Sequence, residues 1–415
     1  MNRYLSFSFI FGAILILGFM AVPGDYGARA QNGPVWERFL EFDPDSKVTI
    51  NHKPLSDILR QTVFPMGTSK RILGTQAKGI LYTGTRIRRG GSGTASPSRY
   101  EGNRLMLHSF SDEHEEFFRG YQKGLENLSN RRPLRELNKN EQLAFWLNLH
   151  NVIIINKLIE EYPIDKLKSL RQSKRGTPFW EEKVTTIGGV PLSLMDIEQI
   201  VYHNFDNPVA IYGLFQGTIG GPRLATVAFD GDNVWMVLEN NASEFVNSNR
   251  GVRPKGTRVD VSIFYEWSKV AFGGSDEAVL DHIFSYGRYS FLGDLSGIQS
   301  LKYKNYNWKI ADLLGGTLHS GMTINYAAFL ANYNSTGGGG FQGVSGETQM
   351  GSVDLTGWLV NNAPVGFNLE NLLPPHAYDL ISAAYRNNNL PFKTPVITTI
   401  ECPPGDPCLE VDYDN

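Results

Sequence analysis

Residues 138–163 read NKNEQLAFWLNLHNVIIINKLIEEYP, a run of good helix formers with apolar side chains at every angular position through its middle. A surface helix would show a single apolar stripe, so this pattern predicts a helix that other elements enclose on most sides. Asn138 is expected to cap the start, with Glu141 in the capping-box position, and Pro163 ends the run because it lacks an N–H. The sequence therefore predicts a central buried helix over 138–162.

Three polar residues of this helix, Glu141, Asn148 and Asn151, gather on one side, within about 80° of each other at 100° per residue. A buried polar group without a partner costs roughly 1–3 kcal/mol. The three side chains are therefore expected either to tie the helix to neighbouring loops or to line a polar pocket, and both interpretations remain open. His150 falls on the opposite, apolar side, which favours a core histidine over a ligand or a base.

Residues 141–151, Glu-Gln-Leu-Ala-Phe-Trp-Leu-Asn-Leu-His-Asn, resemble the signature helix of the domain of unknown function 547 family (DUF547). Members usually carry Ile in place of Leu147 and Tyr in place of His150. Later blocks resemble the family in the same order: Leu-Ser-Leu and Asp-Ile-Glu at 192–198, and Tyr-Asn-Trp at 306–308. The resemblance implies a domain from about 134 to 311, but no reaction, because none is established for the family.

A glycine-rich loop at 216–224 follows an apolar run, 209–215, which predicts a short strand. Small residues let a backbone approach a ligand closely, and loops that follow strands often bind ligands. Family members commonly read Asn-Cys-Ala-Ser-x-Ser-Cys-Pro-Pro-Leu here, whereas this chain has Gln216 and Gly221 at the two cysteine positions. An amide cannot replace a thiolate as a nucleophile. The resemblance therefore implies a degenerate member in which Gln216 forms hydrogen bonds only.

The candidate pocket combines the polar residues of these segments: Glu141, Asn148, Asn151, Glu198, Gln216 and Arg223. The first hypothesis is that the protein binds a small molecule or a partner protein there. The alternatives are a hydrolase or transferase that uses Glu141 and Glu198 as acid and base, and a structural or interaction module. The eight histidines show no metal-ligand spacing, so neither a metal nor another cofactor is expected.

The N-terminal 30 residues have the features of a signal peptide: Arg3, an apolar stretch over 5–22, and Ala28-Arg29-Ala30 before Gln31. Export to the periplasm or the extracellular space is expected, and the alternative is an uncleaved membrane anchor at 5–22. The net charge of −3 gives no reason to expect nucleic acid as a partner. The only cysteines, Cys402 and Cys408, lie in one proline-rich segment and predict a disulfide in an oxidising compartment.

The domain organisation follows from these segments. After the signal peptide (1–30), residues 31–132 form an N-terminal extension with a basic Gly/Ser/Pro linker, 133–312 the DUF547-like domain, and 313–415 a Gly-rich loop and C-terminal extension. Helical spacing predicts further helices over 107–128, 193–199, 233–249 and 276–286, and two glycines predict a hairpin over 183–192. The expected fold class is α+β, with helices around a small mixed or antiparallel sheet.

Overall fold

The computed structural model describes residues 33–316, except 70, 72–95, 99–100, 174, 289–290, 292, 294, 296 and 314, together with residues 400 and 401. The expected signal peptide and the cysteine pair, Cys402 and Cys408, lie outside the described residues. So do most of the basic linker and of the Gly-rich loop.

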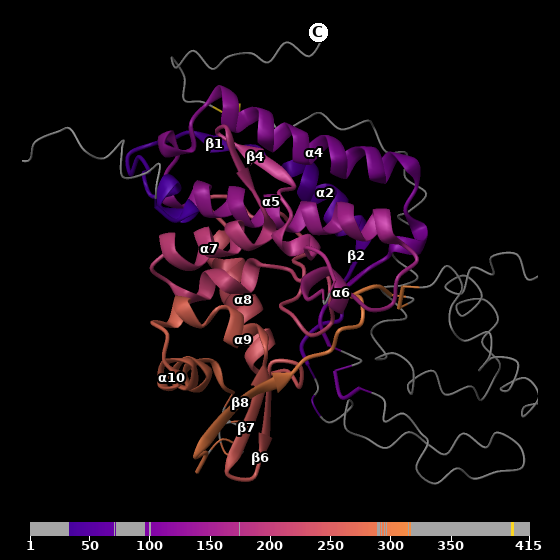
Figure 1. The fold of residues 1–415 in the computed structure, drawn as a ribbon, viewed down its shortest axis with the longest axis vertical. Coiled ribbons are helices and arrows are strands. Elements are labelled where there is room, and N and C mark those ends of the chain that lie inside the picture. Colours follow the sequence, from indigo (N-terminus) through magenta and orange to yellow (C-terminus); the bar gives the residue numbers. More distant parts are fainter. Residues whose placement is uncertain are drawn as a thin grey trace, which may run out of the picture.

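The predicted central helix is confirmed as α5, Lys139–Glu161. Every side chain from Glu141 to Ile155 is buried, and other elements surround the helix (Figure 1). The side chain of Asn138 caps it by accepting hydrogen bonds from the N–H groups of Asn140 and Glu141. The expected capping box does not form, because the Glu141 carboxylate accepts its hydrogen bonds from two other segments.

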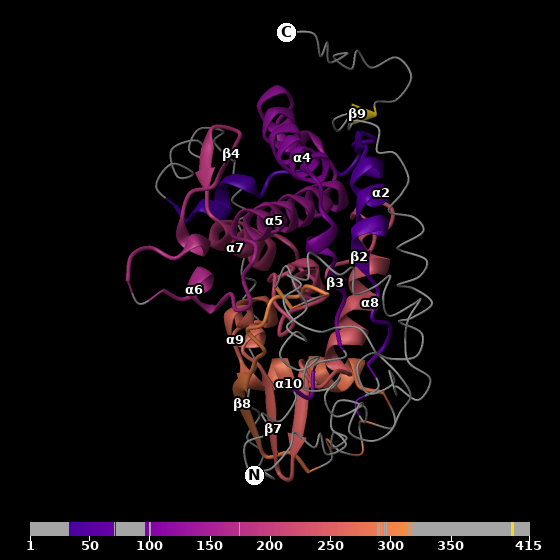
Figure 2. The ribbon, with the colours of Figure 1, turned by 90° about the vertical axis from the view of Figure 1, so that its right-hand side faces the viewer.

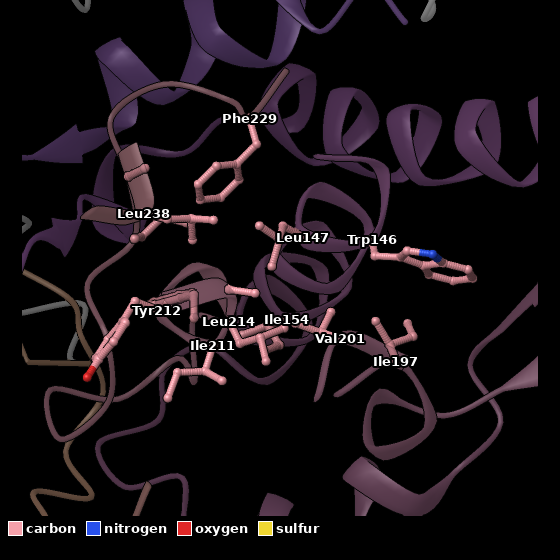
Figure 3. Packing of buried hydrophobic residues seen from close by; sticks show 14 of the residues in the cluster. Trp146, Leu147, Ile154, Ile197, Val201, Ile211, Tyr212, Leu214, Phe229 and Leu238 are labelled. Carbon is pink, nitrogen blue, oxygen red and sulfur yellow. The ribbon is translucent and has the colours of Figure 1, made fainter. Parts of the chain in front are cut away.

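Helices cover α5 on several sides. Helix α4 (Asp112–Arg131) packs along it, and α7 (Leu194–Asn204) and α8 (Val234–Val246) contact it elsewhere (Figure 1). The helix predicted around Ser193 is confirmed with its capping box, in which Ser193 and Asp196 bond each other's backbone N–H. Figure 3 shows Leu147 of α5 pointing toward Phe229 and Leu238, while Trp146 points to the other side. The core is therefore built around α5.

The strand predicted over 209–215 is wrong, because Pro208–Gly213 forms the 3-10 helix η5. Its apolar side chains are buried among helices, so no strand lies beside them to complete a ladder. Asn207 caps it by accepting a hydrogen bond from the N–H of Val209. At its end, a Cβ on Gly213 would lie 2.6 Å from Leu147 Cδ1. A short apolar run does not distinguish a strand from a buried helical turn, and here tertiary packing decides.

The predicted α+β class is confirmed. The largest described sheet is mixed, with β6 (Val252–Lys255) antiparallel and β8 (Ser300–Asn305) parallel to the middle strand β7 (Arg258–Ser262). It lies at one end of the molecule, and α2, α4 and α5 lie toward the other (Figure 2). The predicted hairpin is confirmed as β4 (Thr185–Ile187) and β5 (Val190–Leu192). The helix predicted over 276–286 is confirmed as α10, Asp276–Tyr286.

The N-terminal extension contributes to the same core as the DUF547-like region, through residues such as Ile50, Leu55 and Leu105. Two short antiparallel pairs accompany it: β2 with β3, and β1 with β9. None of the described helices is both long enough and apolar enough to cross a membrane. The remaining elements are η1 (Val35–Phe39), β1 (Thr49–Ile50), α2 (Lys53–Thr62), β2 (Val63–Phe64), β3 (Arg104–Leu105), η2 (Leu107–Ser109), η3 (Leu134–Glu136), α6 (Lys168–Arg171), η4 (Phe179–Glu181), α9 (Phe264–Trp267), η6 (Lys269–Phe272) and β9 (Ile400–Glu401).

Candidate functional site

Two amides of α5 bind the backbone of the segments that cross it. Asn148 Nδ2 donates to the Phe229 carbonyl at 2.7 Å, and the Phe229 N–H donates to Asn148 Oδ1 at 3.0 Å. Asn151 Nδ2 donates to the Gly213 carbonyl at 2.9 Å, and the Phe215 N–H donates to Asn151 Oδ1 at 3.0 Å. Each amide thus satisfies buried backbone groups that no regular ladder pairs. The interpretation of these amides as ties to neighbouring loops is confirmed.

Asn148 and Asn151 also line a small internal cavity together with apolar side chains of α2 and α5. Its volume is about 10 Å³. A cavity needs about this volume to hold a single water molecule. The polar face of α5 therefore encloses room for a water, not for an organic ligand.

Glu141, at the start of α5, holds two segments that are far apart in the sequence. Its Oε1 accepts a hydrogen bond from the Gly231 N–H at 3.1 Å, and its Oε2 accepts one from the Ile50 N–H at 3.3 Å. The side chain is only 3% exposed. Burial raises the pKa of Glu141 to about 7 against the effect of these two hydrogen bonds, and Asp230 and Asp232 add to the rise.

Glu198, on α7, forms a buried ion pair with Arg171 of α6, and side chains from η4, α5 and the loop at 216–224 lie around it. Arg171 donates to both carboxylate oxygens, each at 2.8 Å, and also to Gln216 Oε1 at 2.6 Å. Trp180 Nε1 at 3.1 Å and Gln216 Nε2 at 3.0 Å donate to Glu198 Oε1 as well. His150 Nε2 lies 3.5 Å from the same oxygen. The side chains of Glu198, Arg171 and Gln216 thus bind one another. We call these three residues, together with Trp180 and His150, the Glu198 cluster.

The charges of this pair stabilise each other. Burial alone would raise the pKa of Glu198, but the opposite charge of Arg171 and its bidentate hydrogen bonds outweigh this and hold the pKa well below its usual range. The pKa of Arg171 is likewise raised, because Glu198 outweighs the effect of burial. Glu198 is therefore a carboxylate at any physiological pH. It cannot serve as a proton donor in this arrangement.

Sequence reasoning missed Arg171 and Trp180. Arg171 lies at the end of the four-residue helix α6, in a basic segment that reads DKLKSLRQSKR. Its neighbours Lys166 and Lys168 are exposed, whereas Arg171 is buried. Composition and spacing do not distinguish the buried Arg171 from the exposed Lys166 and Lys168. The remaining signal was the carboxylate itself, since a buried Glu198 requires a cationic partner.

Aromatic side chains cover the arginine. The Arg171 guanidinium lies 3.8 Å from the centre of the Trp267 ring, and Trp267 in turn contacts Tyr306 and Trp308. The loop after η5 is held against this segment, because the N–H groups of Ile219 and Gly220 donate to the carbonyls of residues 309 and 307. Within the segment 305–310, Asn305 ends β8, and residues 309 and 310 make isolated bridges.

Arg223 lies at the other end of the loop and apart from Gln216. Its Nε donates to Asn241 Oδ1 at 2.8 Å. A second buried ion pair, Arg250 with Glu244, lies nearby, and Arg250 Nε donates to the Gly221 carbonyl at 3.1 Å. Buried ion pairs therefore fix the loop at Gln216 and at Gly221. These contacts hold both ends of the loop against the core.

The structure brings together some of the six candidate residues and separates others. Glu198 and Gln216 share one cluster, and Asn148 and Asn151 line one small cavity. Glu141 and Arg223 each bind other groups. Gln216 and Gly221, at the family's cysteine positions, are adjacent: a Cβ on Gly221 would lie 2.8 Å from Gln216 Cβ. The described residues contain no group of three or more His, Cys, Asp or Glu side chains arranged to hold a metal ion.

The family match covers three of the segments on which the sequence resemblance is based: the central helix, the residues around the start of α7 and the loop at 216–224. Residues 134–246 match the family model described as "Protein of unknown function, DUF547". Over these residues the chain is similar to that family. The match begins at Leu134, where the resemblance begins, and it includes α5, α7, η5 and α8. Residues 305–310, which contact the loop at 216–224, lie beyond the match. No curated protein and no solved structure matches the chain.

Proposed function

We propose that this protein is an exported binding module that performs no catalysis at the Glu198 cluster. The observation that carries the proposal is the pairing within the cluster. Arg171 and Glu198 neutralise each other, and Gln216 uses both ends of its amide on that pair. An ionised carboxylate whose two oxygens both accept hydrogen bonds from Arg171, with an amide beside it, offers neither a free nucleophile nor a proton donor. Export is supported by Arg3, the apolar stretch over 5–22 and Ala28-Arg29-Ala30.

The ligand is proposed to be a small molecule or a partner protein, and its site to lie on the surface and not along α5. The cavity beside Asn148 and Asn151 admits about one water, whereas two open surface pockets each have a volume of about 370 Å³. Pockets that bind small molecules usually measure about 300–1,000 Å³. Both surface pockets are therefore large enough for a small organic ligand. The net charge of −3 disfavours nucleic acid as the ligand.

A carboxylate-dependent hydrolase is the second candidate, and one observation favours it. The pKa of Glu141 is raised to about 7, which suits a general acid or base. Against this, both of its oxygens accept hydrogen bonds from backbone N–H groups, and the side chain is buried. If Glu141 were catalytic, Glu141→Gln would abolish turnover of an ester, amide or glycoside substrate while the fold was retained. The binding proposal expects no turnover from the wild type.

An interaction module is the third candidate. It is favoured by Leu40 and Phe42, which are 47% and 41% exposed in the segment that follows η1. Two exposed apolar side chains alone are common on protein surfaces. A larger apolar patch would be needed to distinguish a docking surface from ordinary surface composition.

A thermal-shift screen of small molecules tests the binding proposal. A stabilising compound is expected for the wild type, and Asn148→Ala and Gln216→Ala should lower the melting temperature yet bind that compound with unchanged affinity. The reason is that both side chains bond the protein and not the ligand. A screen without any stabilising compound would contradict the proposal. A folded variant that no longer binds the compound would indicate that the ligand binds at the polar side of α5.

A further inference from the structure

One of the two surface pockets combines an apolar floor with a charged rim. It lies between η1, the end of α4, η3 and the β4–β5 hairpin, and we call it the hairpin pocket. Apolar side chains from each side line it: Phe39, Leu134, Ile187 and Val190. Arg38, Glu41 and Arg135 also line it, and all three are exposed. An apolar body with a polar head group would match this arrangement.

The charge on the rim selects the sign of that head group. Arg135 places a guanidinium on the rim of the hairpin pocket, in a chain whose overall charge is −3. Arg135 makes no ion pair with any carboxylate among the described residues. A guanidinium presents a planar fork of N–H donors that matches carboxylate or sulfonate oxygens, and such charge-assisted bonds are about twice as strong as neutral ones. The pocket therefore favours an anion over a neutral or cationic molecule.

The second surface pocket, lined by Arg119, Lys157, Glu160 and Phe179 among others, provides an internal comparison, and we call it the helix pocket. Its volume is the same, about 370 Å³. Its cations, however, are already paired: Arg119 with Glu115 at 3.3 Å, and Lys157 with Glu161 at 2.8 Å. The helix pocket thus has the size of the hairpin pocket, but both of its cations form ion pairs, whereas Arg135 of the hairpin pocket forms none with a described carboxylate.

From this contrast we propose that the hairpin pocket is the binding site of an amphipathic organic anion, with its apolar body on the half-buried Phe39 and Val190 and its head group on Arg135. The proposal rests on the proposed binding function and specifies its ligand class. The apolar part gains from leaving water, and the arginine determines that the head group is negative.

Two fluorescent probes that share one ring system separate these contributions. 1-Anilinonaphthalene-8-sulfonate carries an anionic head group, and N-phenyl-1-naphthylamine lacks it. Titration of the full-length protein should give a single site for the sulfonate, with a dissociation constant about tenfold lower than that of the neutral probe. Arg135→Glu should weaken the sulfonate at least about tenfold, again the scale of one charge-assisted bond, and leave the neutral probe unchanged.

Matched variants decide between the pockets. Arg119→Glu makes the same change of charge in the helix pocket and should leave both dissociation constants unchanged. Equal affinity for the two probes, or loss of the sulfonate with Arg119→Glu in place of Arg135→Glu, would overturn the proposal. These outcomes leave the binding function itself standing if the thermal-shift screen has found a ligand. A screen without any ligand would instead refute the binding function.

Discussion

Replacement of Glu141 by glutamine should remove a pH dependence that this one carboxyl gives to the stability of the fold. In the folded protein, burial raises the pKa of Glu141 from its ordinary value of 4.5 to about 7. Between these two pH values the folded state retains a proton that the unfolded chain has released. The stabilisation is therefore fully present below pH 4.5 and is lost as the pH rises through 7.

The magnitude follows from the two pKa values. At 1.36 kcal/mol per pKa unit, the free energy of unfolding should fall by about 2–3 kcal/mol between pH 5 and pH 8 on account of Glu141. Urea denaturation gives the free energy of unfolding of the wild type and of Glu141→Gln at both pH values. The change with pH in the wild type minus the change in the variant is the contribution of Glu141, because the other titrating groups contribute equally to both proteins. The glutamine amide can accept only one of the two backbone hydrogen bonds, a cost of about 1–3 kcal/mol that does not vary with pH.

Glu116→Gln is the matched control, because Glu116 is exposed on α4. It should follow the pH profile of the wild type. The reasoning would be refuted if Glu141→Gln and the wild type lost stability in parallel from pH 5 to pH 8.

Three further substitutions test the ties around α5 by equilibrium denaturation. Glu198→Gln leaves the buried Arg171 without its countercharge and should lower the free energy of unfolding by about 3–5 kcal/mol. Arg119→Ala breaks an exposed pair and should lower it by less than about 1 kcal/mol. Similar losses for the two variants would contradict a buried pair at Glu198. Gly231→Ala places a Cβ 2.3 Å from Glu141 Oε1 and should lower the free energy of unfolding by about 1–3 kcal/mol, because the carboxyl is displaced. In a protein that already carries Glu141→Ala this cost should disappear, because no carboxyl is left to displace. Asn148→Ala leaves the N–H and the carbonyl of Phe229 unpaired and should destabilise by about 1–3 kcal/mol per group; a loss below 0.5 kcal/mol would indicate that water replaces the amide.

The central helix could be predicted from the sequence because its signal is local. Residues 138–163 hold both the cap and the terminating proline, and their apolar residues occur at every helical angle. The hairpin at 185–192 and the capped helix after Ser193 depend on equally local turn and cap chemistry. These elements formed as predicted. The run 209–215 did not, because its conformation depends on the helices around it and not on its own composition.

In the candidate site, too, the sequence predicted some features and not others. The sequence identified Glu198 and Gln216 as candidate pocket residues, and the structure places them in one cluster. It could not identify Arg171, which only the three-dimensional fold distinguishes from the exposed lysines beside it. Angular position on a helix placed Glu141, Asn148 and Asn151 on one side, but it did not identify their partners. Glu141 and Asn148 both bond the segment 229–231, Glu141 also bonds Ile50, and Asn151 bonds the segment 213–215. Those segments are far away in the sequence, so periodicity carries no information about them.

The most direct test compares two variants in one binding assay, the titration with 1-anilinonaphthalene-8-sulfonate. One variant, Gln216→Ala, alters the Glu198 cluster, and the other, Arg135→Glu, alters the rim of the hairpin pocket. If the polar groups around α5 are structural and the ligand binds at the surface, the first variant binds the probe as the wild type does, and the second binds it at least about tenfold more weakly. A folded Gln216→Ala protein that loses the probe, with Arg135→Glu unaffected, would contradict that division between structure and function.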